Sequence, residues 1–369
     1  MKRFLLFFHL MLSFSAVFAT DFCRIDKQSE TVPDRLKTTP EIAAYLTRNL
    51  NSPTEKVRAI YSWIALNIRY DVLKMKLNET YLNPQELVDY ALSKRVGVCA
   101  NYTALFNAFC LSVGIQDYVI EGYVRQNGKL ILNGHSWNAV KIDNGFYNID
   151  VTWAAGYVDN DKFTPKYKDE FFMVSPSEFI KTHMPNDPIW QFSSNPITFK
   201  EFDSDNFQKL TIKSTYNFSD SIRMLTKQNT LEQLNHKRRR IIQCGLTNSF
   251  IKSTMTDLYN EITNEELRIQ TETYNRAVTE MNQGVIEYNK YVACRQNSVI
   301  KSKEDAGNLM VLLKSARKKT QDASLVLSSV KTENLTLSAD IKRFRKDIVS
   351  KFSYIDAEIS NVLNFTTKF

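Results

Sequence analysis

The chain has 369 residues, of which 43% are hydrophobic and 24% are charged, and its formal net charge is +8. The length allows two domains, each large enough to bury a core of its own. The composition excludes a wholly disordered chain, because disordered chains contain few apolar residues and a larger share of charged ones.

The first residues have the pattern of a targeting segment. Lys2 and Arg3 precede an apolar run over residues 4–18, and residues 17–19 fit the small-residue pattern of a cleavage site. The run is too short to span a bilayer comfortably. We therefore expect a signal peptide over residues 1–19, an exported protein in the periplasm or outside the cell, and no membrane span after cleavage.

Helix signals come first in the rest of the chain. Residues 52–55 form a capping box with proline at the first helical position. Apolar residues at helical spacing follow over 57–68, so this helix should bury one face. A shorter helix is expected to begin at 39–41, and another to run over 99–113 with Gly114 as its stop.

Strand signals follow the helices, over residues 118–125, 135–142 and 146–153. Residues 143–145 read Asp-Asn-Gly, a strong hairpin signal between the last two strands. Helices followed by an antiparallel sheet predict an α+β fold for this half of the chain.

The remaining chain has a different composition, because all nine prolines lie at or before Pro196. Apolar residues recur at intervals of three and four over 255–262 and 341–362, which predicts helices that bury one face against another helix. We expect a connecting segment over 201–220 and a helical bundle or coiled-coil-like domain over 221–369.

The helical half is also basic, with clusters at residues 237–240 and 317–319. Such clusters are typical of solvated helix faces, and binding to an anionic surface polymer is the alternative. The apolar stripes could also join copies of the chain into an oligomer. Nucleic acid is not expected as a partner, because aromatic residues do not alternate with the basic ones.

Cys99 has the surroundings that a nucleophilic thiol needs. The thiolate is the attacking species, so the pKa of the thiol must fall below its ordinary value of about 8.5. Cys99 stands at the expected start of a helix, whose partial positive charge favours a thiolate, and Gly97 lets the chain turn into that helix. The chain has five cysteines, so at least one thiol is left unpaired in an oxidising compartment.

His135 and Asp150 could act as the base and the group that orients it. Side chains alternate along a strand, so His135 and Ala139 share one face. With a two-residue turn at 144–145, Ala139 faces Asp150, which places Asp150 on the His135 face but four residues away, about 13 Å. The triad therefore requires a wider connection, a bulge or strong coiling of the sheet.

A metal or cofactor site is not expected. The histidines that follow the signal peptide are His135, His183 and His236, and they lie far apart in the sequence. The chain has no glycine-rich phosphate loop and no serine nucleophile elbow. Cys110 falls among core positions and is interpreted as structural.

Several segments of the first half, taken in order, resemble the transglutaminase-like superfamily, in the branch that is similar to kyphoscoliosis peptidase. The resemblance covers roughly residues 40–200. It rests on the helix before the core (60–71), the nucleophile segment (94–106), the histidine strand (134–140), the aspartate strand (146–153), and a tail at 182–185 and 190–191.

The resemblance implies a papain-like α+β core over residues 20–200 that attacks amide bonds through a thioester. The oxyanion would be held by the Cys99 backbone N–H and one upstream donor, with Tyr70 and Tyr102 both left open. Trp137 and Trp153 are expected to pack and shield the site, and His183 to be structural. The implied catalytic residues are Cys99, His135 and Asp150, and the candidate oxyanion or site-lining residues are Tyr70, Tyr102, Trp137 and Trp153.

Three functions fit these observations. The preferred one is an exported cysteine protease or amidase that acts on protein or peptide, because no acceptor site for an amine can be read from the sequence. The alternatives are a transferase that cross-links proteins and a non-catalytic interaction protein that uses the fold as a scaffold. Residues 101–103 form a glycosylation sequon beside Cys99, and a glycan there would obstruct the site, so we expect a bacterial source.

Overall fold

The structure is a computed structural model that describes residues 22–77, 83–205, 217–297 and 300–367. The signal peptide expected over 1–19 lies outside these ranges, as does most of the expected connecting segment. Among the described residues, no helix is both long enough and apolar enough to cross a membrane.

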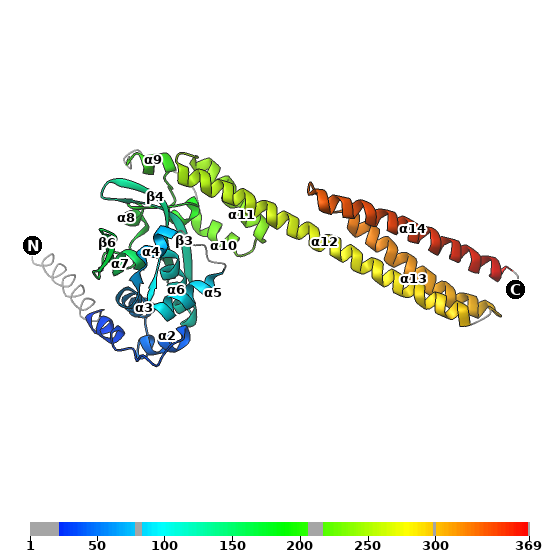
Figure 1. The fold of residues 1–369 in the computed structure, drawn as a ribbon, viewed down its shortest axis with the longest axis horizontal. Coiled ribbons are helices and arrows are strands. Elements are labelled where there is room, and N and C mark those ends of the chain that lie inside the picture. The colour runs from blue at the N-terminus through cyan, green and yellow to red at the C-terminus, as the bar shows by residue number, and fades with distance from the viewer. Residues whose placement is uncertain (1–21, 78–82, 206–216, 298–299, 368–369) are drawn as a thin grey trace, which may run out of the picture. The chain divides into compact units, whose positions relative to one another are not determined.

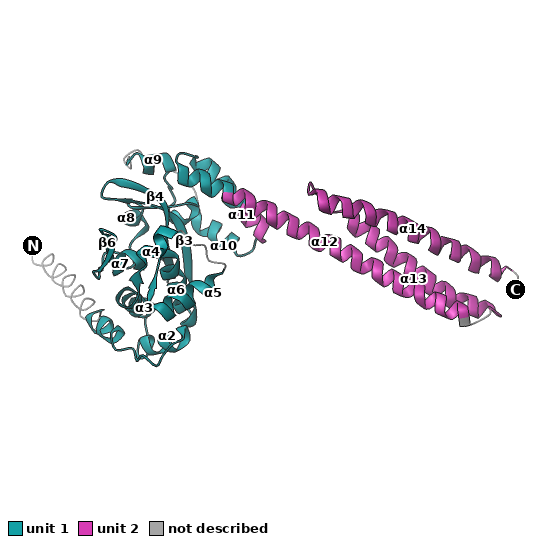
Figure 2. Cartoon of the chain, viewed as in Figure 1, with its two compact units in different colours: residues 1–228, 235–256 teal, residues 229–234, 257–369 magenta. Residues whose placement is uncertain are grey.

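The chain forms two compact units, which Figure 2 shows in different colours. The first unit consists of residues 1–228 and 235–256, and the second of residues 229–234 and 257–369. Helix α12 (Ser249–Asn297) therefore contributes residues to both units.

The first unit contains short helices and a small antiparallel sheet (Figure 1). Its helices are α2 (Thr39–Thr47), α3 (Pro53–Asn67), α4 (Val72–Leu77), α5 (Pro84–Lys94), α6 (Cys99–Ser112), α7 (Val151–Ala155), α8 (Pro176–Phe179), the 3-10 helix η1 (Pro188–Gln191), α9 (Phe199–Asp203), α10 (Phe218–Leu225) and most of α11 (Thr230–Cys244). Its strands are β1 (Arg69–Tyr70), β2 (Val96–Gly97), β3 (Asp117–Gln126), β4 (Lys129–Ile142), β5 (Gly145–Ile149), β6 (Gly156–Asp159), β7 (Lys162–Pro165) and β8 (His183–Pro185).

Local signals account for the main helices. The Ser52 hydroxyl accepts a hydrogen bond from the Glu55 backbone N–H, and the Glu55 carboxylate accepts one from the Ser52 N–H, so the predicted capping box is confirmed. Helix α6 begins at Cys99, as predicted, and the chain leaves it through Gly114 at a φ of 73°. That left-handed conformation is readily available to glycine.

The four-stranded sheet has the order β5-β4-β3-β8, with every pair antiparallel. Helix α6 lies against it: Leu105, Phe106 and Phe109 share one buried core with Val140 of β4 and Ile149 of β5. The predicted α+β class is thus confirmed, with helices packed on an antiparallel sheet.

The β4–β5 hairpin turns one residue earlier than predicted. Ile142 pairs with Gly145, so the turn consists of residues 143 and 144 rather than 144 and 145. Asp143 adopts a φ of 54°, a conformation that aspartate tolerates better than most residues. The third expected strand is also shorter, because Asp150 caps helix α7 and ends the extended segment.

The second unit is helical, as predicted, and is formed by the rest of α12, α13 (Lys303–Ser328) and α14 (Leu335–Thr366), which Figure 1 shows alongside one another. The buried residues of α14 recur mostly at seven-residue intervals: Leu337, Ile341, Ile348, Ile355 and Val362. On α12, a Cβ at Gly284 would lie 3.2 Å from the Ala316 carbonyl oxygen of α13, so glycine permits close approach of the two helices.

Candidate active site

Cys99 is the first residue of α6 and is separated from strand β2 by Val98 alone. The Asn101 side chain accepts a hydrogen bond from the Val98 N–H at 3.0 Å and so caps the start of the helix. A Cβ at Gly97 would lie 2.5 Å from the Asn101 Cβ, so the residue before Val98 must be glycine for this cap to form. Gly97 was predicted to let the chain turn into the helix, and the reason is steric: a larger residue there would clash with the Asn101 side chain.

His135 on β4 is joined to Asp150, which follows β5. Their Nε2 and Oδ2 atoms are 2.7 Å apart, and the Trp153 backbone N–H donates to Asp150 Oδ1 at 3.0 Å. The earlier turn explains this contact. The β4–β5 register places Asp150 beyond the pair of Asn138 and Ile149, and so two residues from His135 instead of four. No bulge in this hairpin is needed.

The electrostatics of the site favour an ionised thiol. Burial raises the pKa of Cys99, but hydrogen bonding to His135, the charge on His135 and hydrogen bonding to Ser136 outweigh it and lower the pKa from its ordinary value. Because His135 Nε2 faces Asp150, Nδ1 is the ring nitrogen left for the thiol.

The imidazole and the carboxylate stabilise each other's charges. Burial lowers the pKa of His135, but the charge of Asp150 and the hydrogen bonds to Asp150 and Cys99 raise it to about 10. Asp150 is completely buried, which raises its pKa, yet the charge on His135 and the hydrogen bonds from His135 and His183 hold that pKa well below its usual range. The carboxyl group is therefore ionised at neutral pH.

His183 joins the same carboxylate, which the sequence did not predict. Its Nε2 lies 3.1 Å from Asp150 Oδ2, the oxygen that His135 also contacts. His135 and His183 lie far apart in the sequence but close together in the fold, because β8 adds to the sheet beside β3 and so brings His183 close to β4. The position of His183 in the predicted tail segment 182–185 was the only sequence signal.

The convergence of two imidazoles and a carboxylate also meets the donor requirements of a metal site. One ligand atom from each of His135, Asp150 and His183 lies within 4.8 Å of the others. These same atoms form the hydrogen bonds already described. No metal site was expected because the histidines are separated in the sequence, and the structure brings two of them together. The contacts among His135, Asp150 and His183 are hydrogen bonds within the protein.

The two tyrosines left open as oxyanion donors occupy different environments. Tyr102 is completely buried and donates its hydroxyl proton to the Ile68 carbonyl oxygen at 2.6 Å, which removes it from the candidates. Tyr70 pairs with Gly97 across β1 and β2, next to the nucleophile segment. Burial, followed by the negative charges of Cys99 and Asp150, raises the pKa of Tyr70, so its hydroxyl keeps its proton.

The two tryptophans surround the histidine rings. Trp137 is buried, and its ring centroid lies 6.2 Å from that of His135 and 5.2 Å from that of His183. Trp153 is partly exposed and lies 5.6 Å from His135 and 4.6 Å from His183. Both tryptophans therefore pack against the two imidazoles, and their shielding of the site stays a prediction.

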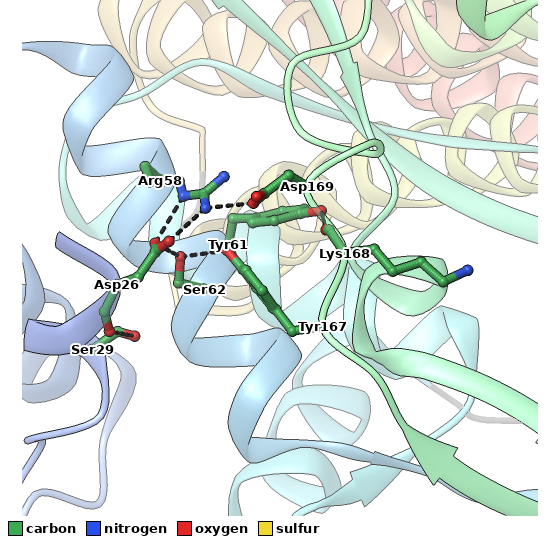
Figure 3. Close-up of polar contacts among 8 residues, drawn as sticks. All are labelled: Asp26, Ser29, Arg58, Tyr61, Ser62, Tyr167, Lys168 and Asp169. Atoms are coloured by element: carbon green, nitrogen blue, oxygen red, sulfur yellow. Dashed lines mark hydrogen bonds and ion pairs between the residues drawn. The ribbon is translucent and has the colours of Figure 1, made fainter. Parts of the chain in front are cut away.

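A segment at residues 166–172 covers the Asp150 side of the site. The Phe171 carbonyl oxygen accepts a hydrogen bond from the Asp150 backbone N–H at 3.2 Å, and the Phe171 ring meets Trp153 edge-on. Buried Arg58 of α3 contacts both Asp26 and Asp169 at 2.5 Å (Figure 3). Arg58 therefore ties this segment to the helix core.

The sequon residue Asn101 has a structural role. Its side chain is completely buried, accepts from the Val98 N–H and donates to the Leu87 carbonyl oxygen. A glycan on this residue would disrupt the helix start and would not simply obstruct the site. The bacterial source expected from the sequon stays a prediction.

The cysteines differ in environment, and all five are free thiols within the described chain. Cys23 and Cys294 are exposed, Cys99 is partly exposed, and Cys110 and Cys244 are buried. Burial raises the pKa of Cys110 and Cys244, which keeps these thiols protonated. Cys99 is the cysteine whose surroundings lower its pKa.

Comparison with known proteins matches residues 40–151 to the model of the transglutaminase-like superfamily. Kyphoscoliosis peptidase of Mus musculus is 30% identical over 178 residues, which cover 46% of this chain and 26% of that protein. Hillarin of Drosophila melanogaster is 26% identical over 207 residues, which cover 50% of this chain and 24% of that protein. The alignments thus span about a quarter of these curated relatives.

Among solved structures, the crystal structure of a TGase is similar to part of this chain. It is 18% identical with a TM-score of 0.27, and the match covers 41% of this chain and 35% of that one.

Proposed function

Because residues 40–151 form a transglutaminase-like domain, we propose that this chain is an exported thiol enzyme that hydrolyses amide bonds of protein or peptide. Cys99 is the nucleophile, His135 the acid and base, and Asp150 the group that orients His135. The observation that carries this proposal is the 2.7 Å contact of His135 Nε2 with buried Asp150. The same imidazole lowers the pKa of Cys99.

The reaction has two steps. First, Cys99 Sγ attacks the amide carbonyl carbon, His135 gives a proton to the leaving nitrogen, the C–N bond breaks and a thioester forms. Water then attacks the thioester carbonyl while His135 accepts one of its protons. The C–S bond breaks, which releases a carboxylic acid and restores Cys99.

The negative oxygen formed in both steps needs hydrogen-bond donors. The Cys99 backbone N–H stands in the first turn of α6, where it has no intrahelical acceptor. We assign the second donor to Tyr70, because it lies beside Gly97 and keeps its proton, whereas the Tyr102 proton is used by Ile68.

Alkylation with iodoacetamide tests the nucleophile. Because its surroundings lower the pKa of Cys99, this thiol should react at pH 6 roughly tenfold to 100-fold faster than the exposed thiol of Cys294. Peptide mapping by mass spectrometry measures both residues in the same sample, which makes Cys294 an internal reference. A Cys99 rate equal to or below that of Cys294 at pH 6 would rule out the proposed enzyme.

Two further measurements narrow the reaction. The variant His135→Gln should return Cys99 to the rate of an ordinary thiol, and Cys99→Ser should abolish cleavage of a protein substrate. Incubation with a dansylated amine and a glutamine-bearing protein separates hydrolysis from transfer. Incorporation of the amine that depends on Cys99 would contradict hydrolysis and identify a cross-linking transferase.

A further inference from the structure

We propose that His183 is a positioning residue of this site: a neutral imidazole whose Nε2–H holds the Asp150 carboxylate in the orientation that His135 requires. The inference rests on the proposed function, since it assigns a role within the same site. It adds a fourth side chain, from a different strand, to Cys99, His135 and Asp150.

The hydrogen bonds of Asp150 carry the first part of the argument. Oδ1 accepts from the Trp153 backbone N–H at 3.0 Å, and Oδ2 contacts both His135 Nε2 at 2.7 Å and His183 Nε2 at 3.1 Å. Asp150 is completely buried, so these protein donors replace the water that an ionised carboxylate otherwise needs. Without His183, Oδ2 would depend on His135 alone, the residue that Asp150 has to orient.

The other ring nitrogen of His183 fixes the tautomer. The Thr182 hydroxyl lies 2.8 Å from His183 Nδ1 and 3.4 Å from the Phe179 carbonyl oxygen. Its one proton is best placed on the shorter contact, which makes Nδ1 an acceptor and leaves the imidazole proton on Nε2, facing Asp150. His183 is thereby a donor to the carboxylate.

The surroundings of His183 keep it neutral. Its side chain is buried against the Phe179 ring, with centroids 3.9 Å apart, and close to Trp137 and Trp153. Burial lowers the pKa of His183 to about 4, against the raising effect of Asp150 and with a further lowering effect of the charge on His135. At neutral pH His135 is therefore the charged imidazole that faces the Asp150 carboxylate. His183 donates a hydrogen bond to the same carboxylate as a neutral group.

The sheet holds His183 in place. Within β8, Met184 pairs with Tyr123 and Pro185 pairs with Gly122 of β3. A Cβ at Gly122 would lie 2.1 Å from the Met184 carbonyl oxygen, so β8 can approach this closely only because that position is glycine. Just after β8, buried Asp187 binds Arg240 through two contacts of 2.7 Å. His183 thus lies on a well-anchored strand, as a positioning residue requires.

Two variants of the full chain separate the donor from the ring. His183→Phe keeps an aromatic ring but has no donor, and His183→Gln offers an amide N–H near the position of Nε2. The measurement is the pH dependence of Cys99 alkylation by iodoacetamide. In His183→Phe we expect the pH midpoint of alkylation to rise by about one unit, because the hydrogen bond to the charged Asp150 carboxylate is lost. At pH 6 this shift makes the alkylation rate roughly tenfold lower. In His183→Gln we expect a rate within about threefold of the original.

Three outcomes would overturn the proposal: an unchanged midpoint in His183→Phe, a lower midpoint, or equal loss in both variants. Nitrogen NMR of the original chain with labelled histidine gives a test that does not depend on activity or on the folding of a variant. His183 should be neutral with its proton on Nε2 between pH 5.5 and 7.5, and a protonated ring or the other tautomer would contradict the inference. If Cys99 proves unreactive in the original chain, the proposed function fails while the NMR result still decides the state of His183.

Discussion

Replacing Arg58 with methionine tests how the first unit holds the segment that covers Asp150. The Arg58 side chain is 4% exposed and binds Asp26 through two contacts, of 2.8 and 2.5 Å. It also contacts Asp169, and its guanidinium carbon lies 5.0 Å from the Phe172 ring centroid. Methionine retains most of the apolar volume and removes the charge and the hydrogen bonds.

Asp26 and Asp169 should contribute differently to the free energy of unfolding that Arg58→Met removes. Asp169 is 71% exposed and can regain water, so its share is small, whereas Asp26 is 22% exposed and loses a paired cation. Removing one partner of a buried ion pair costs about 3–5 kcal/mol, and the partial exposure of Asp26 places the expected loss near 3 kcal/mol. For a unit of this size the loss corresponds to a fall in Tm of about 6–12 °C.

Urea unfolding followed by tryptophan fluorescence measures this loss. All four tryptophans belong to the first unit, so the signal does not report on the second. Arg223→Met is the matched control, because Arg223 is 69% exposed and pairs with Asp220 on the same helix, a contact worth less than about 1 kcal/mol. If Arg58→Met changes the free energy of unfolding by no more than Arg223→Met does, the reasoning about this buried contact is wrong.

Two further predictions concern the sheet. Gly122→Ala places a Cβ 2.1 Å from the Met184 carbonyl oxygen, so β8 must move. We expect the free energy of unfolding in urea to fall by about 3 kcal/mol and the fast alkylation of Cys99 to be lost. An unchanged urea midpoint would contradict this prediction. Burial raises the pKa of Asp117 from 3.8 to about 7, so its contribution to stability is full below pH 4 and is lost as the pH rises to 7. Asp117→Asn should therefore gain stability relative to the original chain by several kcal/mol, on the order of 4, between pH 4 and 8, and parallel stability curves would refute this.

The features that could be predicted from sequence are those set by neighbouring residues. The capping box at Ser52 and the helix that begins at Cys99 depend on side chains within one turn of the helix, and both are present in the structure. The alternation of side chains along β4 likewise placed Asp150 on the face of His135.

The features that could not be predicted depend on choices between nearly equivalent local conformations or on distant pairing. The sequence predicted a turn at residues 144 and 145, whereas the structure turns one residue earlier, with Asp143 in a left-handed conformation. This single step moves Asp150 from four residues to two from His135. The place of His183 depends on β8 pairing with β3 across about 60 residues, for which a three-residue strand carries almost no local signal.

The charge arrangement of the site explains why His183 matters although local rules do not reveal it. An ionised thiol, an imidazolium and a carboxylate give one excess negative charge in a largely buried place, where an unpaired charge is costly. A second cation would neutralise that charge but would compete with His135 for Asp150. Neutral donors avoid this competition, and they are the groups found here: the backbone N–H groups of Trp153 and Ser136, and His183. These neutral donors cannot be identified from the sequence, because any buried strand can supply a donor. They become identifiable once the pairing of the strands is known.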